Sequence, residues 1–218
     1  MHIKKSKMPT AWPIPRKGKR KRFIAVPSHA VSKGISLLFI LRDILDVAKT
    51  RKEVRYMALN GFVKINNKIR KDENFPLQVF DVVNLEKSGK NYRLEIVNKK
   101  YSLKEISDKE AGQKIVKIIG KKVLKEGKVQ MNLDDGQNII TNKTFSVGDS
   151  AILNTIENKL EKILPLKKGA SIEIIGGKHA GEKGELVDFV KLARGKSYVV
   201  KLNGKETALP FKTILVIE

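Results

Sequence analysis

Few residues of this 218-residue chain have side chains that could carry out catalysis or hold a metal ion. Cysteine is absent, which excludes a thiolate nucleophile, a disulfide bond and a cysteine zinc site. His2, His29 and His179 stand apart in the sequence, and a three-histidine metal site would leave no spare ligand. The adjacent acids of Asp134-Asp135 precede a glycine, which is typical of a turn and not of a catalytic pair. We therefore expect no catalytic residue, no metal site and no cofactor.

A second candidate for chemistry is the glycine-rich stretch over 176–181, which follows a predicted strand over 172–175. A phosphate loop for a nucleotide is a rival interpretation. However, a P-loop ends in Gly-Lys-Ser/Thr and leads into a helix, and neither feature is present here. His179 has no evident partner acid or nucleophile. The stretch therefore predicts neither a nucleotide loop nor a catalytic histidine.

The net charge indicates the class of partner. The chain holds 45 Lys and Arg against 23 Asp and Glu, which gives a formal net charge of +22. Such a field opposes compact folding, and it favours a polyanionic partner, either nucleic acid or an anionic membrane surface. Most of the cations are lysines, which suit phosphate contacts better than base reading. No long apolar stretch and no signal-peptide pattern is present, so we expect an intracellular protein without a transmembrane helix.

The first 35 residues form a purely cationic arm with ten basic residues and no acid. Its prolines and its few apolar residues predict an extended segment that is disordered alone and orders on a polyanion. Trp12, the only tryptophan, could stack on a base or pack on its own protein, and both alternatives stay open. The predicted nucleic-acid-binding residues of the arm are Lys4, Lys5, Lys7, Trp12, Arg16, Lys17, Lys19, Arg20, Lys21 and Arg22.

Residues 36–90 begin with a helical pattern. Apolar residues recur at helical spacing over 37–48. Thr50 and Glu53 then have the spacing of a capping box, in which each side chain accepts a hydrogen bond from the backbone N–H of the other residue. This box opens a second predicted helix that ends near Leu59, before a glycine.

A hairpin signal follows the two predicted helices. Val63 and Ile65 alternate before Asn66-Asn67, and asparagine tolerates the positive φ of a tight turn. A last strand is expected over 79–85. The outward cations of the helices and the hairpin can gather on one face that grips phosphate. These predicted binding residues are Arg42, Lys49, Arg51, Lys52, Arg55, Lys64, Lys68, Arg70 and Lys71.

The second half of the chain has mainly strand patterns. Alternating residues predict strands over 92–97 and 115–124. The spacing over 107–110 is that of a second capping box with a short helix. Asp-Gly and Asn-Gly pairs predict hairpins at 134–136 and 203–204.

Two stretches resemble known RNA-associated modules. TRKEVRYMALNGFVKINNKIRKD, followed by FDVVNL, resembles the S4 module, in which two helices and a hairpin hold structured RNA. SIEIIGGKHAGEKGELVDF resembles the KOW motif of ribosomal proteins and elongation factors, whose loop commonly meets RNA or protein. This resemblance implies that Lys178, His179 and Lys183 contact the phosphates of a nucleic acid. With HIKK, LLFILRD and ISDKEAGQK, nearly the whole chain resembles the ribosomal S4e family. Asn66-Asn67 replaces the expected Asn/Asp-Gly turn, and no basic extension follows Val216, which favours the shorter archaeal form.

The resemblance implies an α+β, multidomain fold. Its expected parts are an extended basic N-terminal arm (1–35), a helical S4-type RNA-binding domain (36–90), a central β-rich domain (91–165) and a C-terminal KOW, SH3-like β-barrel (166–218).

The resemblance also implies a structural protein of the small ribosomal subunit, in the cytoplasm. Its expected partners are small-subunit ribosomal RNA and neighbouring ribosomal proteins, with no membrane and no small-molecule substrate. The alternatives are an RNA-modifying enzyme and a KOW-type elongation factor that docks through an S4-type module. A pseudouridine synthase would need a catalytic aspartate in a large α/β domain, for which residues 91–218 lack length and pattern. An elongation factor would need no acid-free arm.

Overall fold

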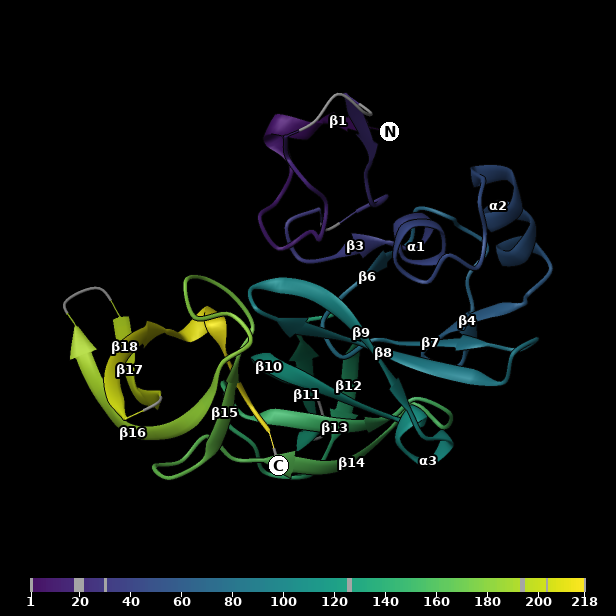
Figure 1. Cartoon of the computed structure of the whole chain (residues 1–218). Helices are drawn as coiled ribbons and strands as arrows, with labels where there is room; N and C mark the ends of the chain where they lie inside the picture. Colours follow the sequence, from purple (N-terminus) through teal and green to yellow (C-terminus); the bar gives the residue numbers. More distant parts are fainter. Residues whose placement is uncertain are drawn as a thin grey trace. The chain divides into compact units, whose positions relative to one another are not determined.

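The computed structural model describes residues 2–17, 22–29, 31–124, 127–192, 195–202 and 204–217. Most of their regular secondary structure is strand, and the helices among them are short (Figure 1). The expected α+β class therefore holds in part, as a mostly β fold with few helices. The chain divides into two compact units, which we describe separately. Unit 1 comprises Met1–Ile96 and Lys100–Gly112, and unit 2 comprises Val97–Lys99 and Gln113–Glu218.

The N-terminal arm folds as part of unit 1, although its composition predicted an extended segment. Its first and last strands pair antiparallel, with His2 opposite Ala25. Met8, Trp12 and Val26 are buried, so the arm has more apolar surface to bury than we expected from its charge. Its elements are β1 (His2–Lys4), η1 (Lys5–Lys7) and β2 (Phe23–Ala25).

The first predicted helix is shorter than its apolar pattern indicates. After α1 (Leu37–Phe39) the turns widen to π type in η2 (Ile40–Ile44), where Leu45 N–H donates to the carbonyl five residues earlier at 2.9 Å. Asp46 then adopts a left-handed backbone with φ of 52°, which ends the helix and turns the chain away. The helix predicted over 37–48 is therefore wrong beyond η2.

The second predicted helix is confirmed as α2 (Arg51–Leu59). Thr50 Oγ1 accepts a hydrogen bond from Glu53 N–H at 3.3 Å, and Glu53 Oε2 accepts one from Thr50 N–H at 3.3 Å, so the capping box forms. Gly61 follows the helix with φ of 74°, a conformation that glycine accepts without strain. Beside the helices lies a two-stranded sheet of β3 (Ile35–Ser36) and β6 (Pro76–Leu77).

The main sheet of unit 1 has the strand order β5-β4-β7-β8-β9. The predicted hairpin between β4 and β5 is confirmed, since Asn66 and Asn67 have φ of 50° and 60° and Ile65 pairs with Lys68. Asn66 also ties the turn to β7, because its Oδ1 accepts a hydrogen bond from Val82 N–H at 2.9 Å, while its Nδ2 donates to Asp81 Oδ1, just before that strand, at 2.8 Å. The strands are β4 (Val63–Ile65), β5 (Lys68–Ile69), β7 (Val82–Leu85), β8 (Lys90–Val97) and β9 (Lys100–Ile106).

Strand β8 pairs with β7, so the sheet of unit 1 continues beyond residue 90, where we expected the helical domain to end. The short helix predicted after the next strand is present as α3 (Asp108–Ala111). Its capping box is not, because the Ser107 side chain makes no capping hydrogen bond. Glu110 instead forms an ion pair with Arg93 of β8 at 3.6 Å, so its carboxylate is not the capping partner of the Ser107 N–H.

Unit 2 contains two five-stranded antiparallel sheets, with the orders β12-β11-β10-β13-β14 and β18-β17-β16-β15-β19. The first sheet consists of β10 (Gln113–Val123), β11 (Val129–Leu133), β12 (Asn138–Thr141), β13 (Ser150–Asn154) and β14 (Lys159–Leu164). The second consists of β15 (Ser171–Ile174), β16 (Lys183–Leu192), β17 (Gly195–Leu202), β18 (Lys205–Pro210) and β19 (Ile214–Val216), with the turn η4 (Phe211–Thr213).

The hairpins predicted for unit 2 are present. Gly136, with φ of 88°, lies between β11 and β12, which pair antiparallel. Strands β17 and β18 also pair, although Asn203 of the predicted Asn-Gly turn lies outside the described residues. The two sheets share an apolar core, because Ile152 and Leu164 of the first pack with the inward side chains of the second.

Candidate nucleic-acid interface

Two arginines on α2 are held by one acid from the loop after β5. Glu73 is 8% exposed, and its Oε1 accepts hydrogen bonds from Arg51 Nε at 3.1 Å and Arg51 Nη2 at 2.7 Å. Its Oε2 lies 4.0 Å from Arg55 Nε. The side chains of Arg51 and Arg55 are still 60% and 67% exposed. A guanidinium carries five N–H donors, so both side chains keep further donors for an anion.

Local sequence explains this arrangement. The capping box sets where α2 begins, and residues four apart on a helix lie on the same side, as Arg51 and Arg55 do. Glu73 is held in place by its own backbone, because its carbonyl accepts Leu38 N–H at 2.8 Å. The N–H of Lys49, at 2.7 Å from Glu53, contributes most to a lowered pKa of the Glu53 carboxyl, so this acid is occupied at the helix start.

The hairpin adds cations in different states. Lys64 forms an ion pair with Glu86. The guanidinium carbon of Arg70 lies 4.9 Å from the centroid of the Phe75 ring, and its buried Nε has no hydrogen-bond partner among the described residues. Several lysines of unit 1 make no ion pair within the described ranges, among them Lys7, Lys49, Lys52, Lys68 and Lys71.

Besides Arg51 and Arg55, three predicted cations are compensated within the protein. Arg42 donates to Asp43 Oδ2 at 2.5 and 2.9 Å, and Lys183 lies 3.9 Å from Glu173. Arg42, Lys183 and Lys64 must each exchange a carboxylate of the protein for a phosphate before they can bind nucleic acid.

The arm supplies exposed cations and one buried aromatic residue. Trp12 is 1% exposed, and its Nε1 donates to the Gly34 carbonyl at 3.0 Å. Of its two alternatives, Trp12 therefore packs on its own protein. The prediction that Trp12 binds nucleic acid is corrected, because no face of its ring is accessible for stacking. Arg16 Nη2 donates to the Met8 carbonyl at 2.6 Å.

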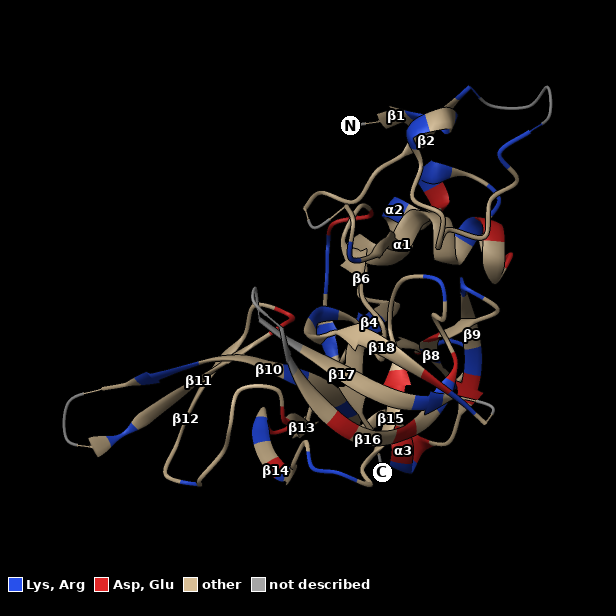
Figure 2. Cartoon of the chain, turned by 90° about the vertical axis from the view of Figure 1, so that its left-hand side faces the viewer, with Lys and Arg blue, Asp and Glu red and all other residues tan. Residues whose placement is uncertain are grey.

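The other arm residues form a cationic surface. Lys5 Nζ lies 3.5 Å from the Lys17 carbonyl, and Arg22 is exposed beside Phe23. Lys4 is also exposed, and Figure 2 shows Lys and Arg in blue along the arm and α2. Lys19, Arg20 and Lys21 lie outside the described residues.

The glycine-rich stretch of unit 2 is the loop between β15 and β16. His179 Nδ1 lies 3.1 Å from Glu182 Oε2, a partner acid that we did not recognise in the sequence. Lys178 is exposed and forms no ion pair among the described residues. No helix follows the loop, because β16 begins at Lys183.

The described part of the chain offers neither a metal site nor a membrane span. No group of three His, Asp or Glu side chains in it could hold a metal ion. None of its helices is both long and apolar enough to cross a bilayer.

Two residues of unit 1 were missed in the sequence. Glu73 was overlooked because we looked only for cations, although an acid within a cationic stretch is a signal of such a bridge. Lys87 was also overlooked, and its Nζ lies 4.0 Å from the centroid of the Phe62 ring. No sequence pattern near Lys87 indicates this contact, because Phe62 is brought beside Lys87 by the pairing of β4 with β7.

Comparison with protein families identifies two matches. The S4 domain matches residues 44–83, which include α2 and the β4–β5 hairpin, and ribosomal family S4e matches residues 88–160. The crystal structure of the 30S ribosomal protein S4e from Thermoplasma acidophilum superposes with a TM-score of 0.72, covering 85% of this chain and 95% of that one. At 22% sequence identity, this superposition demonstrates a shared fold.

Relatives that align with nearly the whole chain identify its family more specifically than the shared fold does. A small ribosomal subunit protein eS4 from Pyrobaculum aerophilum is 33% identical over 210 residues, which cover 93% of this chain and 88% of the relative. The protein of that name from Methanosphaera stadtmanae is 36% identical over 209 residues, with 94% and 86% coverage. The resemblance noted in the sequence is confirmed, and the chain belongs to the ribosomal S4e family.

Proposed function

We propose that the chain is a structural, non-enzymatic constituent of the small ribosomal subunit that binds small-subunit ribosomal RNA and supports translation. It acts on the ribosome, in the cytoplasm, beside other proteins of the subunit. Relatives that align over nearly its full length are named as small ribosomal subunit proteins, and an S4 domain lies in unit 1. Neither the RNA-modifying enzyme nor the elongation factor has comparable support.

At a finer level, we infer that residues 36–90 act as an S4-type RNA-binding domain and residues 166–218 as a KOW-type barrel. Support for the barrel comes from five antiparallel strands in the order β18-β17-β16-β15-β19, with the glycine-rich loop joining β15 to β16. The arm (1–35) and the central domain (91–165) complete the proposed division. The cations of the loop and the arm are proposed as additional phosphate contacts.

One observation carries the proposed mode of binding, the bridge of Arg51 and Arg55 by Glu73. Holding both guanidinium groups in one place lowers the side-chain entropy that phosphate binding must remove. Free lysines such as Lys52 and Lys68 can then add phosphate contacts without breaking an ion pair. Each phosphate neutralised releases condensed counterions, which drives binding and makes it salt-dependent.

The test is the salt dependence of binding to small-subunit ribosomal RNA. Replacing both arginines by alanine would leave a buried carboxylate unpaired, so the variant Arg51→Ala, Arg55→Ala also carries Glu73→Gln. Losing two phosphate contacts should reduce the slope of log affinity against log salt by about 1.4 to 1.8. The matched control removes two other exposed cations of unit 1, with Lys104→Ala and Lys109→Ala.

The control should keep the wild-type slope, and Glu73→Gln alone separates loss of the bridge from loss of the cations. A wild-type slope in the arginine variant, with the thermal transition unchanged, would show that this face does not bind RNA. Failure of the wild-type chain to co-sediment with small subunits at high salt would overturn the proposed function itself.

A further inference from the structure

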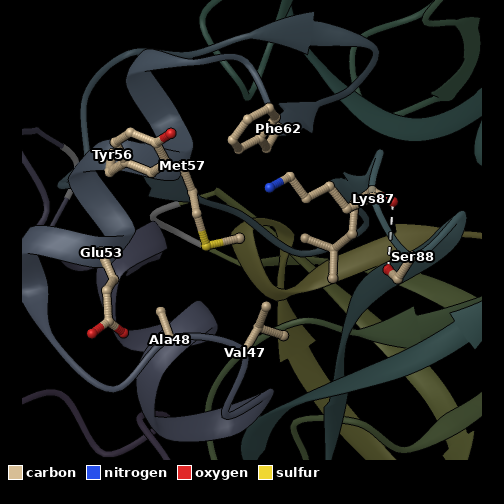
Figure 3. A pocket seen from close by; sticks show the side chains of 9 residues that line it. Val47, Ala48, Glu53, Tyr56, Met57, Phe62, Lys87 and Ser88 are labelled. Atoms are coloured by element: carbon tan, nitrogen blue, oxygen red, sulfur yellow. Dashed lines mark hydrogen bonds between the residues drawn. The ribbon is translucent and has the colours of Figure 1, made fainter.

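A groove with a volume of about 310 Å³ opens beside α2 (Figure 3). By helical spacing, its α2 residues Glu53, Tyr56 and Met57 lie on the opposite flank of the helix from Arg51 and Arg55. The groove lies wholly within unit 1. Most of its lining is apolar, and one ammonium group reaches into it from the turn after β7. The side chains that define it are Val47, Tyr56, Met57, Phe62, Leu85 and Lys87.

The groove exists because the first helix ends early. The π turns of η2 and the left-handed Asp46 carry the chain away from the helix axis, so Val47 becomes the outer wall and is 47% exposed. Ala48 and Leu85 are buried and form the floor. A regular helix continuing through these residues would have filled this space with its own side chains.

Two aromatic rings and a cation stand at the opening. Tyr56 is 60% exposed, and its ring centroid lies 6.0 Å from that of Phe62 in an edge-to-face arrangement. Lys87 Nζ lies 4.0 Å from the Phe62 centroid. Figure 3 shows Glu53 on the side away from Phe62 and Lys87. There its carboxylate accepts hydrogen bonds from the backbone N–H groups at the start of α2.

We propose that this groove receives one unstacked nucleobase of the RNA that α2 binds. The inference rests on the proposed function and assigns a second, separate contact to the same unit. The base lies against the exposed ring of Tyr56 and the apolar floor, and Lys87 leaves the Phe62 face to meet the phosphate of that nucleotide. Aromatic faces that accept splayed-out bases are the usual means by which proteins recognise single-stranded RNA.

Charge favours RNA over an apolar protein side chain as the occupant. Lys49 follows the lining residue Ala48, and Lys52, in the first turn of α2, precedes the lining residue Glu53. Neither lysine makes an ion pair within the described part of the chain. Lys87 adds a third cation, while the one acid of the lining, Glu53, is engaged by the helix start. The lining has few polar groups to read base edges, so the groove accepts any base.

The test uses the full chain and a single-stranded RNA of about ten nucleotides that carries one fluorescent adenine analogue. Stacking on Tyr56 should quench the analogue when wild-type protein is added. Tyr56→Ser should abolish this quenching and weaken binding about tenfold, which matches the usual strength of base–aromatic stacking. Leu59→Ser is the matched control, because Leu59 is exposed on the same helix but does not line the groove.

A second variant tests the opposite wall. Val47→Glu places an anion at the mouth and should also abolish quenching, whereas Val97→Glu, at a valine of similar exposure, should not. Quenching that persists in the Tyr56 and Val47 variants overturns the groove assignment while RNA binding by the arginine face stands. The assignment is also overturned if the Tyr56 variant binds RNA with unchanged affinity but is no longer incorporated into small subunits. That result would identify a protein side chain as the occupant of the groove. If wild-type protein binds no RNA, the proposed function fails first.

Discussion

Replacing Lys117 with methionine tests how the two sheets of unit 2 are held together. Lys117 lies on β10 and is 4% exposed. Its ammonium donates hydrogen bonds to the carbonyls of Phe211 and Ile214, the latter at 2.8 Å, at the end of the second sheet. It also lies 3.7 Å from the Phe211 ring centroid. Burial lowers the pKa of Lys117 to about 8, although the nearby Asp134 charge acts in the opposite direction.

This lowered pKa makes the stability of unit 2 depend on pH with a definite sign. Between about pH 8 and 10.5 the unfolded chain binds the Lys117 proton and the folded chain does not. The free energy of unfolding therefore rises with pH across this window. A displacement from 10.5 to about 8 corresponds to about 3 kcal/mol, which is an upper bound because the two carbonyls and the ring favour the ammonium form.

The variant Lys117→Met removes this titration. It also leaves the carbonyls of Phe211 and Ile214 without their donor, at a cost of about 1–3 kcal/mol each. That cost is nearly constant with pH, so the stability of wild type relative to the variant should increase by up to about 3 kcal/mol from pH 7 to 10.5. The quantity to measure is therefore how the difference in unfolding free energy between wild type and variant changes with pH, and not its value at one pH.

Urea unfolding of the full chain at several pH values provides the assay. Far-UV circular dichroism follows both units, while fluorescence of Trp12, the only tryptophan, reports on unit 1 alone. Lys121→Met is the matched control, because Lys121 lies on the same strand, is exposed, and contacts the Phe145 carbonyl at 3.3 Å. Parallel stability curves for wild type and Lys117→Met across the window would refute the reasoning.

Three further predictions concern packing and are measured by urea or thermal unfolding. Trp12→Ala should destabilise unit 1 by about 3–5 kcal/mol, because it empties a buried site, and a change below about 1 kcal/mol would mean that the arm is not packed there. Gly184→Ala should cost about 1–3 kcal/mol because its Cβ would lie 2.4 Å from a backbone oxygen of β17. Gly176→Ala, with its nearest contact at 3.7 Å, should be tolerated, and equal effects would contradict the close-approach argument. Asn66→Ala should cost about 1–3 kcal/mol, since the buried Asp81 loses a hydrogen-bond donor, and an unchanged transition would show that this bond is dispensable.

The parts of the fold that were predicted correctly depend on neighbours in sequence. The capping box of α2 joins residues three apart, and the Asn66-Asn67 turn depends on the φ preference of asparagine. Where a local pattern failed, a distant partner was responsible. Ser107 and Glu110 have the right spacing for a box, yet Glu110 pairs with Arg93 on another strand.

The sequence by itself determined the charge, the lack of cysteine, the family resemblance and the local elements around α2. The tertiary structure alone decided between the two alternatives for Trp12 and brought Glu73 to Arg51, 22 residues away in the sequence. It also ended the first helix early enough to open the groove at Val47. The physical reason is that charge and turn preference belong to single residues or near neighbours. Burial, ion-pair partners and cavities instead depend on which distant segments pack together, and no local pattern specifies that packing.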